Sequence, residues 1–168
     1  MPRPITILLI VACTTCAQVD RAKQAFEPFS GHWQGIFRVY NYNGQLLDEL
    51  HVEQRYWWED EVQFGEFVDR YPDGRVVKSN ARNYLEDGVL YCEVIKESGE
   101  KTVHTGYYAD GVLFWFRKTS DGSLVESFKE SVAEERGRKV YYIDGFGVYG
   151  QGEGASYLLF EGRYEKVP

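Results

Sequence analysis

Turn dipeptides at nearly regular spacing constrain the fold of this chain more than any other feature. From residue 29 onward, glycine dipeptides typical of tight turns stand at Asn43-Gly44, Asp73-Gly74, Asp87-Gly88, Ser98-Gly99, Asp110-Gly111, Asp121-Gly122, Arg136-Gly137 and Gln151-Gly152. Asn-Gly and Asp-Gly supply the positive φ angles that two-residue hairpins require. The longer interval between 44 and 74 contains Glu59-Asp60-Glu61, which we interpret as a further turn. Nine turns predict about ten strands joined as a meander.

The segments between these turns have the composition of β-strands. The chain has 4 Trp, 13 Tyr and 10 Phe but one Met, and flat side chains pack well on a pleated sheet. The predicted strands cover residues 32–41, 46–58, 62–71, 75–84, 89–96, 101–108, 112–118, 123–134, 139–149 and 155–166. No long stretch has helical apolar periodicity.

Ten hairpin-connected strands raise the question of what covers the two edges. An open meander would expose both edge strands to aggregation, whereas closure into a barrel removes the edges. We therefore expect an all-β fold, an antiparallel up-and-down meander barrel of about 8–10 strands. A sandwich of two sheets is the alternative.

The N-terminal residues differ from the rest and resemble a signal peptide. Arg3 precedes an apolar run from Ile5 to Cys13 that is too short to span a bilayer. Small residues around Cys16 allow cleavage before Gln18, whereas the segment ending at Cys13 resembles a bacterial lipobox, which would leave Cys13 lipidated. An apolar strand or helix of the domain itself is the alternative reading.

This interpretation divides the chain into three parts. Residues 1–17 form the signal peptide, 18–28 a polar tether or short helical turn, and 29–168 the barrel domain. We expect a secreted, periplasmic or cell-envelope protein, with membrane contact only through a lipid anchor. Cys92 is the one cysteine certain to remain after processing at either site, so no disulfide framework is expected.

Charge argues against polyanionic partners. The formal net charge is −7, from 26 acidic and 19 basic residues, which opposes attraction to a phosphate backbone. We therefore expect no nucleic-acid partner.

The two ends of the barrel domain carry a family resemblance. Phe29-Ser30-Gly31-His32-Trp33 resembles the F-x-G-x-W signature that opens lipocalins and fatty-acid-binding proteins, together called calycins, and Gly162-Arg163-Tyr164-Glu165-Lys166-Val167 resembles their Arg-containing last strand. The resemblance implies that Trp33 closes one barrel end and that Arg163 packs across it as a cation–π partner. Fatty-acid-binding proteins place Arg and Tyr two residues apart, both facing the ligand. Here Arg163 and Tyr164 are adjacent, so they face opposite sides.

Strand alternation suggests which side chains face the barrel interior. The residues expected to line the interior and contact a ligand are Arg38, Phe114, Phe116, Arg117, Glu126, Phe128, Glu130, Tyr142 and Asp144. Carboxylates on an inward face need partners because an unpaired buried charge is costly, and Arg38, Arg70, Arg82 and Arg117 are possible partners. In the alternative, these faces point to solvent and the acids are merely solvated.

Sequence signals for catalysis are weak. Glu126 and Glu130, four residues apart on a strand, lie about 13 Å apart, beyond the ~5–9 Å of carboxylate pairs in glycoside hydrolases. The histidines at 32, 51 and 104 lack metal-ligand spacing, although one strand His could hold haem iron. We expect no metal, no cofactor and no catalytic residue, and enzymatic activity is the third hypothesis.

The leading hypothesis is binding of a small, largely apolar or aromatic molecule inside the barrel. The runner-up is a packed barrel that acts as a structural or interaction module, with Trp57 and Trp58 as an exposed patch. Interior volume separates the two hypotheses, because a void of about 300 Å³ or more suits a ligand and a filled interior suits the module.

Overall fold

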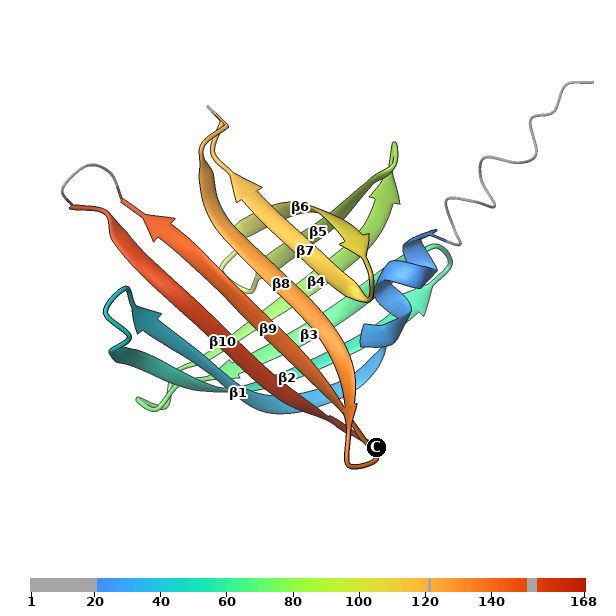
Figure 1. Ribbon diagram of the computed structural model, residues 1–168, viewed down its shortest axis with the longest axis horizontal. Coiled ribbons are helices and arrows are strands. Elements are labelled where there is room, and N and C mark those ends of the chain that lie inside the picture. Colours follow the sequence, from blue (N-terminus) through green and yellow to red (C-terminus); the bar gives the residue numbers. More distant parts are fainter. Residues whose placement is uncertain (1–20, 121, 151–153) are drawn as a thin grey trace, which may run out of the picture.

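The chain forms a closed antiparallel barrel of ten strands (Figure 1). The computed structural model describes residues 21–120, 122–150 and 154–168. The strands are β1 (Gly31–Asn41), β2 (Leu46–Glu59), β3 (Val62–Arg70), β4 (Val76–Glu86), β5 (Val89–Lys96), β6 (Lys101–Ala109), β7 (Val112–Lys118), β8 (Leu124–Glu135), β9 (Arg138–Tyr149) and β10 (Ser156–Val167). Each strand pairs with the next, and β10 pairs with β1. The predicted barrel is therefore confirmed, and the sandwich is excluded.

Turn chemistry explains why the strand boundaries agree with the predicted ones to within two residues. At Asp87-Gly88 both residues have positive φ, 50° and 80°, as a type I′ hairpin requires. Asp60 in the acidic run also has positive φ, 52°, which confirms the turn proposed there. Gln151 and Gly152 lie outside the described residues.

A short helical segment closes one end of the barrel. Residues 21–26 are helical and continue into η1 (Glu27–Phe29). The part of segment 18–28 that the structure describes is therefore helical and is not an extended tether. The buried side chains of the segment are Ala22, Ala25, Phe26 and Phe29. The ring of Phe26 lies 6.4 Å from that of Trp58 and 6.1 Å from that of Trp115. We call residues 21–29 the plug, and Figure 1 shows it in blue at one barrel end.

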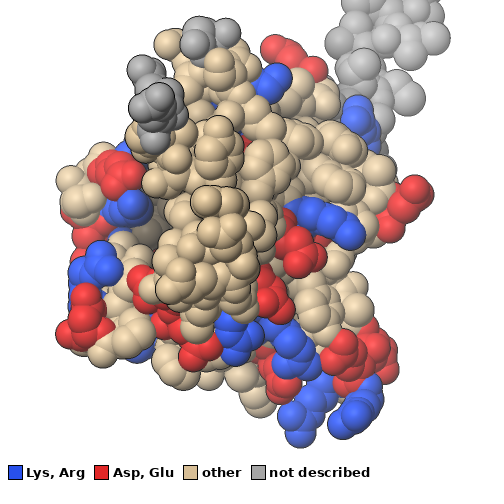
Figure 2. Space-filling view, turned by 60° about the vertical axis from the view of Figure 1, so that its left-hand side comes forward, with Lys and Arg blue, Asp and Glu red and all other residues tan. Residues whose placement is uncertain are grey.

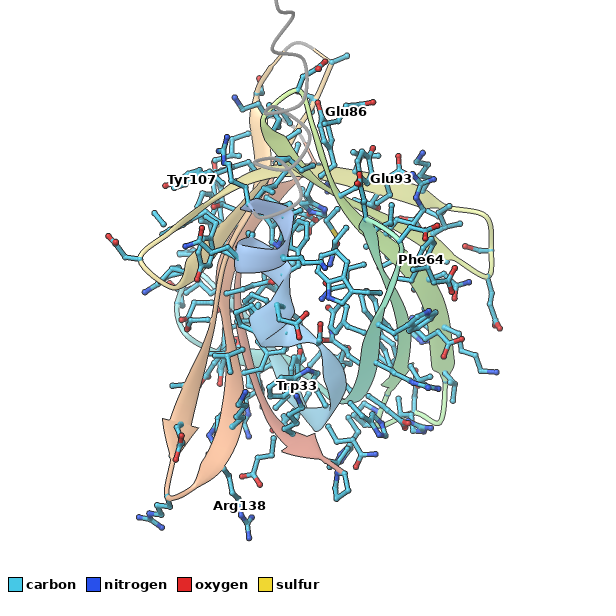
Figure 3. All side chains as sticks on the ribbon, turned by 90° about the vertical axis from the view of Figure 1, so that its right-hand side faces the viewer. Trp33, Phe64, Glu86, Glu93, Tyr107 and Arg138 are labelled. Atoms are coloured by element: carbon cyan, nitrogen blue, oxygen red, sulfur yellow. The ribbon has the colours of Figure 1, made fainter. Side chains whose placement is uncertain are left out.

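Trp33 lies directly inside the plugged end, as the family resemblance implies. Its side chain is fully buried, and its indole Nε1 donates a hydrogen bond of 2.6 Å to the carbonyl oxygen of Phe29. Tyr141 packs edge-on against the indole ring, with 5.6 Å between centroids. The hydrogen bond joins the barrel wall to the plug. Figure 3 shows Trp33 beneath the plug.

The expected Arg163–Trp33 contact is wrong. Arg163 lies on the outer face, where its guanidinium forms ion pairs with Glu135 and Glu165. Trp33 is paired in register with Lys166, whose Nζ lies 5.4 Å from the indole centroid. Residues 163 and 166 point to opposite faces of the strand, so the cation over Trp33 is a lysine.

The outer face gives no support to the patch expected at Trp57 and Trp58. Trp57 stacks on Phe64 on the outer face, with centroids 6.2 Å apart, whereas Trp58 packs against the core. The Trp58 indole donates a 2.7 Å hydrogen bond to Glu27 of the plug. Adjacent strand residues point to opposite faces, so the two rings cannot form one patch.

On the face shown in Figure 2, uncharged side chains cover the centre and the upper part, and charged side chains of both signs lie intermixed along the left edge and at the lower right. Within the described residues, no helix has the length and apolar character needed to cross a membrane.

Candidate functional site

The barrel encloses a cavity of about 340 Å³. Most of its wall is apolar or aromatic, with side chains that include Phe37, Val52, Phe67, Trp115, Phe128 and Ile143. The volume exceeds the 300 Å³ or so that distinguishes a ligand-sized void from a filled interior.

One end of the cavity is closed and the other extends toward the hairpin tips. The plug and Trp33 fill the end where the chain enters the barrel. At the opposite end the lining includes Val39, Tyr71 and Val94, which lie where β1, β3 and β5 approach their tips. We call the region beside the plug the floor and the region near the tips the mouth.

Glu130 is the acidic group of the floor. It lies on β8 between Leu113 of β7 and Ile143 of β9, and its side chain faces the cavity. Burial raises the pKa of Glu130 to about 7, although hydrogen bonds from the Tyr141 hydroxyl and the Trp115 indole partly oppose the rise. The apolar cavity therefore contains a carboxyl group that changes its charge near neutral pH.

Three tyrosines and a cysteine surround this carboxyl group. Burial raises the pKa values of Tyr56, Tyr141 and Tyr164, and the negative charge of Glu130 adds to the rise. Burial also raises the pKa of the Cys92 thiol, again with a contribution from Glu130. The floor thus consists of neutral hydroxyl and thiol groups around one acid.

A second acid, Asp69 on β3, lines the cavity closer to the mouth. Burial raises the pKa of Asp69, and the positive charge of Lys96 partly offsets this effect. The ammonium group of Lys96 lies 2.8 Å from the carboxylate of Glu100. No Lys or Arg is among the cavity-lining side chains in the described parts of the chain.

Glu126, the third inward acid, is fully partnered. Arg117 donates two hydrogen bonds of 2.8 Å to its two oxygens, and Tyr149 donates another. His104 Nε2 lies 3.0 Å from the same carboxylate. Burial alone would raise the pKa of Glu126, but these hydrogen bonds outweigh it and hold the pKa well below its usual range. The group links β6–β9, and it engages the Nε2 of His104, which also lines the cavity.

The structure separates the nine expected interior side chains into three groups. Phe128 and Glu130 line the cavity, and their contact with a ligand stays a prediction. Arg117 and Glu126 form the inward ion pair described above. The expected interior position is wrong for five residues, which lie on the outer face: Arg38, Phe114, Phe116, Tyr142 and Asp144. Cys13 lies outside the described residues.

These five errors arose because the sequence does not show which face of a strand points inward when both faces carry large apolar side chains. On β7 both faces carry large apolar groups, and Trp115 faces inward. Phe114 and Phe116 stack on the exposed ring of Tyr107, at 4.8 and 5.9 Å between centroids. A one-residue change of phase moves a whole strand face to the other side, so every residue of the set is misplaced together.

Several floor residues went unrecognised in the sequence, among them Tyr56, Asn83 and Tyr141. A usable signal was present, because cross-strand partners share a face. The two-residue turn at Asp87-Gly88 pairs Asn83 with Cys92, so these two side chains must face the same side. Among the described residues, no cluster of His, Cys, Asp and Glu could hold a metal ion.

Comparisons with known proteins support the fold. No family model matches the sequence, and no curated protein matches it. Rv2717c from M. tuberculosis superimposes with a TM-score of 0.59 at 17% identity, over 88% of this chain and 98% of that chain. The S-type phycobiliprotein lyase CPES from Guillardia theta gives 0.57 at 10% identity, over 88% and 93%. The closed ten-strand meander and these similarities show that the chain has a calycin-like barrel fold.

Proposed function

We propose that the protein binds a small, largely apolar or aromatic molecule inside the barrel. The observation that carries this proposal is the cavity of about 340 Å³, with its aromatic and apolar wall and the polar groups placed along it. Pockets of this kind obtain affinity from apolar burial and orientation from the polar groups. A barrel that served only as a packed interaction module would have no need for this interior space.

A neutral fluorescent probe tests the proposal. N-phenyl-1-naphthylamine should bind saturably at one site per chain, with a rise in its emission because the wall is apolar. Val94→Trp, which places a large ring in the cavity, should weaken binding at least tenfold. The matched control is Val103→Trp on the outer face of β6, which should bind the probe as the original chain does. Equal binding by both variants would place the probe outside the barrel and contradict the proposal.

We also propose that the protein acts outside the cytoplasm, either secreted or anchored to the cell envelope through Cys13. The support is the basic start and short apolar run of residues 1–17. If Cys13 is acylated, Cys13→Ser should release the protein from membranes, whereas Cys16→Ser should leave it bound. A soluble chain that retains Met1 would contradict export.

A further inference from the structure

The plug determines which way two buried side-chain amides, those of Gln63 and Asn83, are oriented in a row of hydrogen bonds. The carbonyl oxygen of Phe26 can only accept, and it lies 2.8 Å from Gln63 Nε2. The amide nitrogen of Gln63 must therefore face the plug. Its oxygen consequently faces Asn83 and accepts a hydrogen bond of 2.9 Å from Asn83 Nδ2. The orientation of the Asn83 amide follows from this sequence of donors and acceptors.

The last acceptor in this row of hydrogen bonds, Asn83 Oδ1, has no partner among the described residues. Asn83 is 6% exposed and lines the cavity, and its Oδ1 makes no hydrogen bond within the described structure. Buried polar atoms are nearly always hydrogen-bonded, so this oxygen, on a side chain that lines a ligand-sized cavity, is an acceptor for which the described residues supply no donor. The group required is a hydrogen-bond donor, because Asn83 offers an oxygen.

The charges in the cavity point to the same chemistry. Glu130 and Asp69 both line it. Lys96, whose charge acts on Asp69, is paired with Glu100, and Arg117 is paired with Glu126. Among the described residues, Glu130 receives hydrogen bonds from two neutral donors, the Tyr141 hydroxyl and the Trp115 indole. A ligand anion would meet two carboxyl groups and no Lys or Arg among the described lining side chains, and the lining His104 has its Nε2 engaged with Glu126. A ligand cation would instead neutralise the two acids.

Asn83 and Glu130 both line the cavity, and both are related to Cys92. Asn83 is paired in register with Cys92, and the charge of Glu130 acts on the Cys92 thiol. Aromatic rings complete the surroundings, with Trp115 and Tyr56 among the lining residues. The faces of such rings carry negative potential and attract cations.

We propose that the cavity selects an aromatic or apolar amine, whose protonated nitrogen is held at the floor by the Glu130 carboxylate and the Asn83 carbonyl. This inference rests on the proposed function and narrows the ligand class. It departs from the carboxylate-binding chemistry of the fatty-acid-binding proteins that the ends of the chain resemble. Here the cation of the last strand that lies over Trp33 is Lys166, an exposed side chain at the plugged end.

Three probes on one naphthalene frame test the inference: 1-naphthylmethylamine, 1-naphthylmethanol and 1-naphthoate. Affinities are measured by calorimetry at pH 8, where the amine is protonated and Glu130, with a pKa of about 7, is largely ionised. The amine should bind at least tenfold more tightly than the alcohol, and naphthoate should bind most weakly. Glu130→Gln should reduce the affinity for the amine to about the affinity for the alcohol.

Two further variants separate a specific role from general damage. Glu134→Gln removes an exposed carboxylate from the same strand and should preserve the amine preference. Asn83→Ala should weaken amine binding at least threefold while circular dichroism shows an intact barrel. A preference for the amine that survives Glu130→Gln would overturn the role assigned to Glu130.

The outcomes distinguish this inference from the proposed function. Equal affinities for amine, alcohol and naphthoate would refute amine selection and leave ligand binding intact. Failure of all three probes, together with failure of N-phenyl-1-naphthylamine, would refute the proposed function itself.

Discussion

Replacing Glu130 by glutamine should change how stability depends on pH. The pKa of this carboxyl is raised from 4.5 to about 7, chiefly because it is buried. Between these pH values the folded protein holds a proton that the unfolded chain has released. Protonation therefore favours the folded state, and its contribution is fully present below about pH 4.5 and is lost as the pH rises through 7.

The size of the effect follows from the pKa difference. At about 1.4 kcal/mol per pKa unit, the rise from 4.5 to about 7 corresponds to roughly 3 kcal/mol. Glu130 faces a cavity instead of being packed on every side, so we expect about 2–3 kcal/mol. Glutamine has a similar shape and cannot ionise, so the variant lacks this loss of stability.

Urea denaturation followed by tryptophan fluorescence measures the effect at pH 5 and pH 8. The free energy of unfolding of Glu130→Gln, relative to the original chain, should rise by about 2–3 kcal/mol between these pH values. Glu134→Gln, an exposed position on the same strand, serves as the control and should show no such rise. If the difference in unfolding free energy between Glu130→Gln and the original chain is the same at pH 5 and pH 8, burial does not raise the pKa of Glu130 to about 7.

Three further predictions concern the barrel itself. Trp33→Ala should lower the free energy of unfolding by about 3–5 kcal/mol in urea denaturation. The double variant with Lys166→Ala should lose less than the sum of the two single losses, because the two side chains are in contact. Strict additivity would contradict that contact. Gly106→Ala should lower the melting temperature, because its Cβ would lie 2.3 Å from a backbone oxygen of β7; an unchanged temperature would contradict this packing. Arg117→Met should destabilise the barrel by about 2–3 kcal/mol at pH 7, because it leaves Glu126 without its arginine partner. This loss should shrink as the pH falls below about 4, because protonation of the Glu126 carboxylate removes the unpaired charge.

The local periodicity of the sequence determined the number of strands, their limits and their antiparallel order. Turn residues such as those at Asp87-Gly88 act through their own φ angles, which need no distant partner. The helical plug carried a local signal too, since Ala22, Ala25, Phe26 and Phe29 repeat with helical spacing. The segment is short, and its helix is stabilised by packing against the barrel end.

The tertiary structure alone decided which face of each strand is inside. Phe114 and Trp115 are both large and apolar, so their order in the chain does not reveal which one meets the cavity. The same holds for the cation over Trp33, which register assigns to Lys166 and not to Arg163. Asn83 has an unpartnered oxygen because a carbonyl of the plug, 57 positions earlier in the chain, orients the amide between them. Residue type sets what a side chain can donate or accept, but the closure of the barrel decides which groups it meets.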